Sequence, residues 1–142
     1  MSWMVRRHRD GDERGASAVE FALVSIPLML VLVGLMQYGW YFFVSQTASG
    51  AASTVARRLV VGDCWVGNEA QTLAQQQSVQ VTSLTKSPAS LSGATPGVTQ
   101  VVVTVTADAE IIGLLPLPNG GVVTKVVKAR LEDTTAGPAC TA

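Results

Sequence analysis

The chain has 142 residues with no net charge, and only 14% of them are charged. This length allows one small domain beside a membrane segment, and the lack of a basic surface excludes nucleic acid as a partner. Mean hydropathy is positive, at +0.34, because apolar residues gather in one stretch near the N-terminus.

Residues 1–15 form a basic leader without periodicity, for which no regular structure is predicted. Residues 16–61 predict one long helix. Its apolar stretch runs from about Val19 to Val44, which exceeds the roughly 20 residues that cross a bilayer. Aromatic side chains gather at the far end of that stretch, as is typical of a membrane–water interface: Tyr38, Trp40, Tyr41, Phe42 and Phe43.

Arginines on the two sides of the apolar stretch indicate its orientation. Four precede it, and Arg57 and Arg58 follow it. The positive-inside rule therefore favours a cytoplasmic N-terminus by a small margin. We expect a single-pass anchor, in contact with membrane lipid, with residues 62–142 outside the cytoplasm.

Small residues follow the apolar stretch at helical spacing. Ala48, Ala52 and Ala56 recur every four residues, which predicts that the helix continues to about Val60, where Gly62-Asp63 ends it. Two interpretations of this stripe stay open. It could let another helix approach closely, or it could be the exposed face of an alanine-rich helix.

Residues 62–142 predict an α+β head with a small antiparallel β-sheet of about three strands. A short helix is expected from Glu69 to about Gln76, with Asn68 as N-cap and Gln71 completing a capping box. Alternation of apolar and polar residues predicts three strands: Val79–Leu84, Val98–Ala107 and Val122–Glu132.

The segments between the strands carry turn residues. Residues 86–97 predict a loop rich in Ser, Pro and Gly. Pro116 and Pro118 exclude a regular central strand, and Asn119-Gly120-Gly121 predicts a turn. In the last strand, Lys125 interrupts a face that is otherwise apolar.

The two cysteines, Cys64 and Cys140, both follow the apolar stretch and so lie on one side of the membrane. In an exported head such a pair predicts a disulfide. A closed loop of about 75 residues would restrict the unfolded chain by roughly 4–5 kcal/mol. The alternative is two unpaired, small apolar residues, and a metal site is excluded because two cysteines supply too few ligands.

The head lacks the residues that catalysis requires. The only histidine is His8, in the leader, so the head has no imidazole base for a serine or cysteine nucleophile. Asp108 and Glu110 would share one face if their strand continued that far, but such a pair is usually solvated. We therefore predict no catalytic residues, no cofactor and no enzyme activity.

The most informative segment is Arg14-Gly15-Ala16-Ser17-Ala18-Val19-Glu20-Phe21. A glycine stands between the basic leader and the apolar helix, and a carboxylate lies five residues further on. A carboxylate in a membrane span is costly, by roughly 2.5–3.5 kcal/mol at the centre. By itself, Glu20 is also compatible with the inner interface, where it favours the positive N-terminus of the helix.

This segment resembles the prepilin peptidase site of type IV pilin-like proteins, a glycine followed after four residues by Glu-Phe. More of the chain resembles the TadE-like family of minor pilins (pseudopilins) from tight-adherence (Tad/Flp) pilus systems. The shared features are Pro27, the Ala/Arg-rich helix after the span, a valine strand over Val101–Val105, the Leu-Pro-Leu-Pro turn over Leu115–Pro118, and a closing strand.

The resemblance implies roles for individual residues. Gly15 would be the last leader residue and Ala16 the new N-terminus after cleavage. Glu20, followed by Phe21, would serve assembly by neutralising the free amine of a neighbouring Ala16. Pro27 would allow a local kink or be a tolerated membrane proline.

The resemblance also implies a structural function, in Tad/Flp type IVb pilus biogenesis and adhesion. The partners would be a prepilin peptidase, other pilin-like subunits and the assembly platform in a bacterial cytoplasmic membrane. Major pilins of this system lack a sizeable head, so a minor pilin fits better. The rival hypothesis is a membrane-anchored or secreted extracytoplasmic binding protein unrelated to pili, with Ala48-Ser49-Gly50 as a passable signal-peptidase site.

Overall fold

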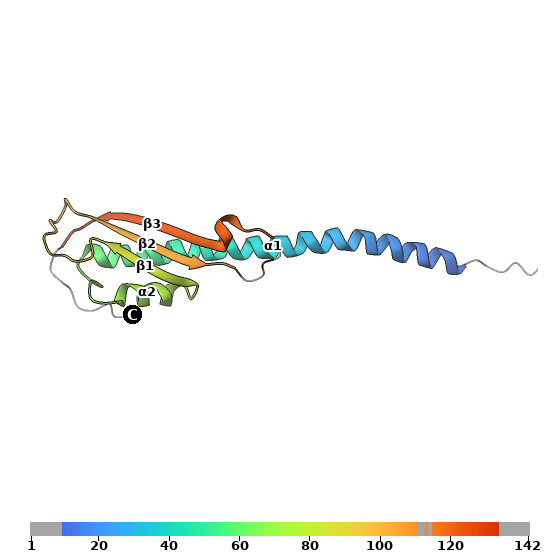
Figure 1. Ribbon diagram of the computed structural model, residues 1–142, viewed down its shortest axis with the longest axis horizontal. Coiled ribbons are helices and arrows are strands. Elements are labelled where there is room, and N and C mark those ends of the chain that lie inside the picture. The colour runs from blue at the N-terminus through green and yellow to red at the C-terminus, as the bar shows by residue number, and fades with distance from the viewer. Residues whose placement is uncertain (1–9, 111–112, 114, 134–142) are drawn as a thin grey trace, which may run out of the picture. The chain divides into compact units, whose positions relative to one another are not determined.

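The computed structural model describes residues 10–110, 113 and 115–133, with side chains from residue 15 onward. The chain divides into two units, residues 1–36 and 37–142, and α1 (Asp10–Val60) runs through both. The other elements belong to the second unit (Figure 1): α2 (Glu69–Gln77), β1 (Val81–Ser87), β2 (Gln100–Asp108), the 3-10 turn η1 (Pro118–Gly121) and β3 (Val122–Arg130).

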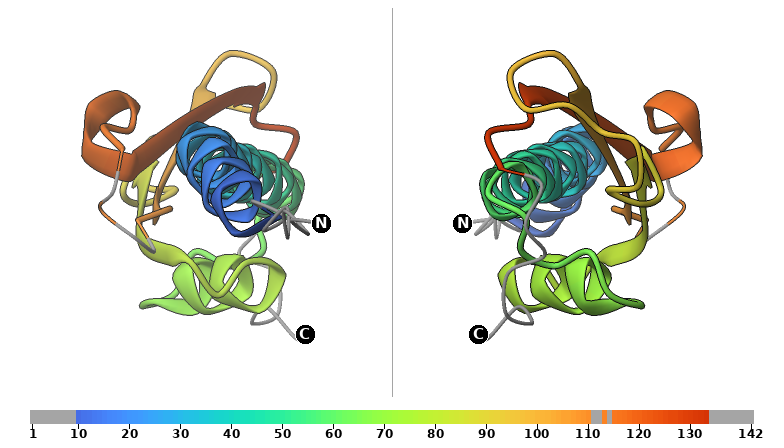
Figure 2. Two further views of the ribbon diagram at one scale, coloured as in Figure 1. Left: turned by 90° about the vertical axis from the view of Figure 1, so that its right-hand side faces the viewer. Right: turned by 90° about the vertical axis from the view of Figure 1, so that its left-hand side faces the viewer.

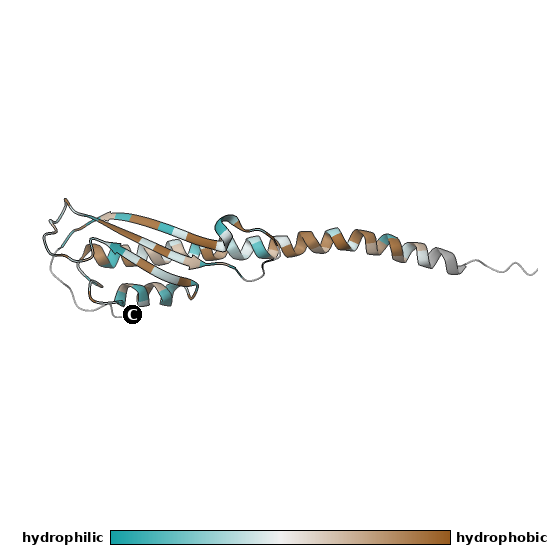
Figure 3. Cartoon of the chain, in the orientation of Figure 1, coloured by the Kyte–Doolittle hydropathy of each residue, from teal (hydrophilic) through white to brown (hydrophobic). Residues whose placement is uncertain are grey.

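The first unit contains the N-terminal part of α1. The helix begins at Asp10, so residues 10–15 are helical although no regular structure was predicted for them. From Val19 to Met36 the large apolar side chains other than Val33 are at least half exposed, and mean hydropathy of the apolar helix reaches 2.4. Figure 3 shows this stretch as an almost continuous apolar band. Exposing a Leu, Val or Phe rather than burying it costs about 1.5–3 kcal/mol each, so this surface requires a lipid or protein environment.

Pro27 lies inside α1, and the helix continues on both sides of it. Proline has no N–H to donate to the carbonyl of residue 23, so one helical hydrogen bond is absent there. The α-helical assignment nevertheless remains unbroken to Val60.

In the second unit, α1 packs beneath a three-stranded antiparallel sheet of order β1-β2-β3. Figure 2 shows the strands arched over α1, with α2 beside β1. The predicted inner face of β2 is fully buried: Val101, Val103, Val105 and Ala107. Cross-strand partners fix the register, with Val103 opposite Val127 and Val105 opposite Leu84. The predicted α+β class with a small antiparallel sheet is confirmed.

The alanine stripe has a different role from both interpretations offered above. Ala48 and Ala52 are fully buried and Ala56 is 2% exposed, all in the core that α1 forms with the chain's own sheet. Their small side chains allow the sheet, rather than another helix, to approach the helix closely. The stripe is therefore neither exposed nor open to a partner helix.

The predicted end of α1 is confirmed at Val60. Gly62 adopts a φ of 88°, a left-handed conformation that glycine tolerates, and its N–H donates to the carbonyl of Leu59 over 3.1 Å. The Val60 carbonyl accepts hydrogen bonds from the backbone N–H groups of Glu132 and Asp133, at 2.8 and 3.1 Å. The end of the long helix is thus fixed to the chain that follows β3.

The smaller elements depart from prediction in identifiable ways. β1 begins at Val81 rather than Val79, which is 86% exposed, and it includes Lys86 and Ser87, which were assigned to the loop. Asn68 precedes α2 as predicted, but its side chain makes no capping hydrogen bond, so the capping box is wrong. The turn at Asn119-Gly120-Gly121 is confirmed, with positive φ at all three residues.

Candidate functional site: the N-terminal motif and the loop held by Gln37

The N-terminal motif lies on an exposed part of α1. Gly15, Ala16 and Glu20 are all exposed, and Phe21 is 74% exposed. Among the described residues, and apart from the adjoining helix backbone, no atom lies within 4 Å of a Cβ built at Gly15. Ala16 and Glu20 are four residues apart and share one helix face, one turn from each other. Their roles in cleavage and assembly stay predictions.

Helix geometry relates Glu20 to the aromatic residues. Twenty residues separate Glu20 from Trp40, which corresponds to about 30 Å of helix, the thickness of a bilayer's hydrocarbon core. Gln37, Tyr38 and Trp40 stand at the start of the second unit, directly after the exposed apolar stretch. In that region the Trp40 and Phe43 rings lie 5.3 Å apart, centre to centre.

Gln37 holds a distant loop at this level of the helix. Its amide nitrogen donates to the Leu115 carbonyl over 2.9 Å, and its amide oxygen accepts from the Leu115 N–H over 3.2 Å. Both contacts join residues 78 positions apart in the sequence. Only 8% of Gln37 is exposed, so this two-point contact satisfies an amide that would otherwise be buried without partners.

Neighbouring hydrogen bonds extend the attachment along the loop. The Tyr38 hydroxyl donates to the Pro116 carbonyl over 3.1 Å. The Gly120 N–H donates to the Leu117 carbonyl over 3.2 Å. The predicted Leu-Pro-Leu-Pro turn, Leu115–Pro118, is therefore held through its backbone, while Pro116 and Pro118 are exposed and Leu115 and Leu117 are half-buried. We call these four residues the apolar loop.

A hollow of about 450 Å³ lies beside the apolar loop. Its lining has one carboxylate, Glu110, and one side-chain amide, Gln37; the other lining residues are apolar or glycine. This set lacks a nucleophile with a base and could not hold a metal ion. Among the described residues as a whole, no group of three or more His, Cys, Asp or Glu side chains could hold one.

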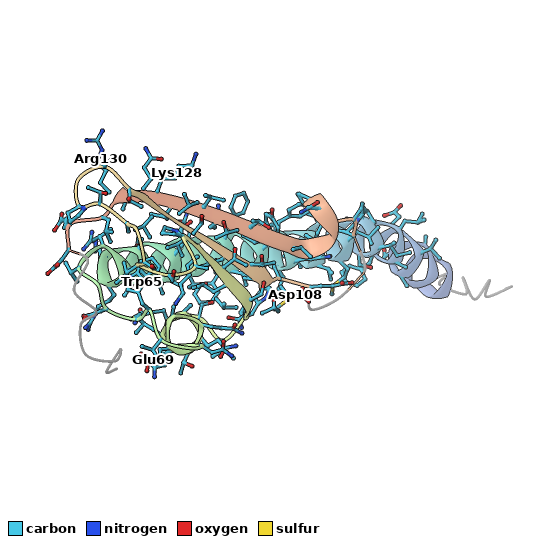
Figure 4. All side chains as sticks on the ribbon, turned by 60° about the vertical axis from the view of Figure 1, so that its left-hand side comes forward. Trp65, Glu69, Asp108, Lys128 and Arg130 are labelled. Carbon is cyan, nitrogen blue, oxygen red and sulfur yellow. The ribbon has the colours of Figure 1, made fainter. Side chains whose placement is uncertain are left out.

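The carboxylate pair at the end of β2 has a structural use. β2 ends at Asp108, so the two side chains do not continue along one strand face. Asp108 instead accepts a hydrogen bond from the backbone N–H of Glu110, at 2.9 Å, and so fixes the start of the following loop. Figure 4 shows Asp108 at this end of the strand, with Lys128 and Arg130 directed outward at the far end of β3.

Lys86 joins β1 to the segment after α1. Its ammonium donates to the carbonyls of Cys64 and Trp65, at 3.1 and 2.8 Å, and lies 5.3 Å from the centre of the Trp65 ring. Burial lowers the pKa of Lys86 from its usual 10.5, and the negative charge of Glu69 opposes that shift. This cation fixes the backbone of the first cysteine and of the residue that follows it.

Cys64 is 1% exposed and is described in its disulfide-bonded form. Cys140 lies outside the described residues, so the predicted Cys64–Cys140 pairing stays a prediction. His8 and the arginines of the leader up to residue 9 also lie outside them.

Sequence reasoning missed Gln37, Tyr38 and Lys86 as site residues. A signal existed for Gln37, since it is the first amide after a long apolar run and such a group needs a hydrogen-bond partner near lipid. Nothing in the sequence indicated that the partner would be Leu115.

A comparison with known protein families matches the segment that contains the N-terminal motif. Residues 15–57 match the family model described as TadE-like protein, which confirms the resemblance noted in the sequence. No curated protein and no solved structure matches the chain. The matched segment begins at Gly15 and ends at Arg57, within α1.

Proposed function

Because residues 15–57 of this chain are TadE-like, we propose that the protein is a minor pilin (pseudopilin). It would act in Tad/Flp type IVb pilus biogenesis and adhesion after processing by a prepilin peptidase. The observation that carries the proposal is the Gly15-to-Phe21 motif at the head of an exposed apolar helix that continues into a folded unit. The family to which the segment is similar consists of pilus-associated proteins rather than enzymes.

Processing would use the open backbone at Gly15. A membrane peptidase must reach the Gly15–Ala16 peptide bond, and among the described residues nothing lies within 4 Å of a Cβ built at Gly15. Cleavage also requires local unwinding, because a helical peptide bond has its carbonyl engaged in the i→i+4 hydrogen bond. Glycine lowers the cost of unwinding by roughly 1 kcal/mol relative to alanine.

After cleavage Ala16 would carry a free ammonium group. Glu20 lies one helical turn away on the same face, so its carboxylate could pair with that ammonium or with the same group on a neighbouring subunit. Attraction between unit charges at about 4 Å rises from roughly 1 kcal/mol in water to about 4 kcal/mol at the lower dielectric near a protein surface. Pairing would thus favour subunits whose helix starts are in register.

The folded unit of residues 37–142 supports a minor role rather than bulk filament formation. A head of this size on each subunit would be a large addition to a filament whose major subunits have almost none. Capping, priming or supporting assembly requires few copies and accommodates the head.

The direct test is N-terminal sequencing of the protein expressed with the prepilin peptidase of its host. The pilin proposal expects Ala16 as the first residue. A start at Ala51 would instead indicate secretion by signal peptidase, and an intact Met1 would indicate a plain membrane anchor. Either of these two results contradicts the proposal.

Substitutions at Gly15 and Glu20, with Gly39→Leu as a control, separate processing from assembly. Gly15→Leu is expected to block maturation, while Gly39→Leu, at a second exposed helical glycine with open space around it, should leave cleavage unchanged. Glu20→Ala is expected to be cleaved normally but to impair pilus formation, and Glu20→Gln should behave in the same way if charge is what matters. Normal pili in Glu20→Ala cells would refute the assigned role of Glu20.

A further inference from the structure

The apolar loop presents only proline and leucine side chains, without a charged, hydroxyl or amide group among them. Pro116 and Pro118 are exposed, and Leu115 and Leu117 are half-buried. Gln37 and Tyr38 attach this loop to the first helical turn of the second unit, immediately after the exposed apolar run that ends at Met36.

The backbone of the loop has few N–H and C=O groups that would lose a hydrogen bond if the loop left water. Pro116 and Pro118 have no N–H, and the N–H of Leu115 is already bonded to Gln37. The carbonyls of Leu115, Pro116 and Leu117 each accept a hydrogen bond from Gln37, Tyr38 and Gly120 respectively. Unsatisfied backbone groups are what normally keep an irregular loop out of a membrane, and this loop has few of them to satisfy.

The depth of the loop follows from the helix. Trp40 and Phe43 belong to the same unit as the loop, and aromatic residues of this kind prefer the boundary between hydrocarbon and headgroups, which puts that boundary close to Trp40. Leu115 is bonded to residue 37, three residues before that point. A membrane boundary at Trp40 therefore brings the loop to the level where the acyl chains meet the headgroups.

We propose that the apolar loop, Leu115–Pro118, is a lipid-contacting element that inserts into the outer interface of the membrane beside the helix. Lipid is the partner because the loop combines exposed apolar side chains, a backbone with few groups left to satisfy and the level of the aromatic residues Trp40 and Phe43, which prefer that interface. The head is then seated on the bilayer at two places, the helix and the loop. This proposal rests on the membrane span and not on pilus assembly.

The test uses tryptophan reporters in the full chain, reconstituted in phosphatidylcholine vesicles at a high lipid-to-protein ratio. Trp3 and Trp40 are replaced by Phe, and Leu117→Trp is introduced. Trp65 remains as an internal reference, since its ring N–H bonds the Leu59 carbonyl, about 33 Å along α1 from Gln37. Emission is compared between vesicles with brominated and with ordinary acyl chains.

We expect the brominated acyl chains to reduce the fluorescence emission of Leu117→Trp. We also expect its emission maximum to lie at a shorter wavelength than that of a tryptophan exposed to buffer. The matched control is Val98→Trp, at an apolar residue that is 76% exposed but lies near the Val60 end of α1, where no quenching is expected. Pro118→Trp provides a second reporter at an exposed position, in case substitution at half-buried Leu117 disturbs the fold.

Equal emission of both reporters in brominated and ordinary vesicles would overturn the proposal. A blue shift without bromine quenching that disappears on dilution with lipid would also overturn it, because a second copy of the chain would then cover the loop. Neither result depends on cleavage at Gly15 or on pilus formation, so failure here is distinguishable from failure of the pilin proposal.

Discussion

At the scale of single residues, Gln37 connects α1 to the apolar loop, which lies 78 positions further along the chain. Gln37→Leu would leave the Leu115 N–H and carbonyl without their partners, and a buried polar group left unpaired costs about 1–3 kcal/mol. We expect a loss of that size in the free energy of unfolding, measured by urea titration in detergent micelles with Trp65 fluorescence. Gln46→Leu, at an exposed glutamine of the same helix, is the control and should change stability by less than about 0.5 kcal/mol.

Lys86 predicts a pH dependence whose sign can be worked out. Burial lowers its pKa in the folded state below 10.5, so the unfolded chain binds this proton more tightly. The free energy of unfolding therefore rises with pH between the lowered folded pKa and 10.5, and the cost of burying the charge is fully present below that window. The unfolding free energy of the wild type minus that of Lys86→Met should increase with pH across this window.

The control for that measurement is Lys128→Met, because Lys128 is exposed on β3 and points away from the sheet. Its difference from wild type should stay flat over the same pH range. If the difference between wild type and Lys86→Met is also independent of pH, burial does not lower the pKa of the Lys86 ammonium and the prediction is wrong.

At the scale of elements, α1 serves two environments with one secondary structure. Its first part is apolar on all sides and exposed, whereas its second part buries one face against the sheet. Ala52 is fully buried in the core that α1 shares with the sheet. Ala52→Leu should destabilise the head by about 1–3 kcal/mol through overpacking, measured by thermal unfolding, with Gln46→Leu again as the control. Unchanged stability would mean that the helix and sheet can separate at no cost.

The same elements show what sequence can predict. The end of α1 and the inner face of β2 were predictable because each depends on local signals, a glycine after the last turn and an alternation of apolar and polar residues that Val102 alone interrupts. The start of β1 was not, since Val79 continues the alternation in sequence but is 86% exposed in the structure. Periodicity reports which residues could share a face, whereas pairing with β2 decides which of them do.

The residues of the candidate site differ in the same way, since some depend on local signals and others on the fold. Gly15 and Glu20 were identified from a short motif, because their proposed roles depend on spacing along one helix. The contact between Gln37 and Leu115 spans 78 positions and depends on the fold that brings them together. The alanine stripe was misinterpreted for that reason too, because its spacing predicts close approach of a neighbour without saying that the neighbour is the chain's own sheet.

At the scale of the whole molecule, the cysteines predict a covalent constraint on the head. If Cys64 is bonded to Cys140, reduction should lower the free energy of unfolding by roughly 4–5 kcal/mol, the value for a loop of about 75 residues. The bond itself is tested by mass spectrometry of the alkylated protein before and after reduction. Alkylation of both cysteines without prior reduction, in protein unfolded by denaturant, would refute the pairing.

β3 has β2 on one side, and within the described residues no strand pairs with its other edge. An open edge of nine residues is a template for unwanted strand addition, and confinement to a membrane surface raises the frequency of encounters between copies. Lys125, Lys128 and Arg130 lie along this strand, so two such edges meeting would bring like charges together. Repulsion between these cations therefore disfavours pairing of β3 with β3 of another copy. Many heads can then be concentrated on one membrane surface without polymerising through their sheets.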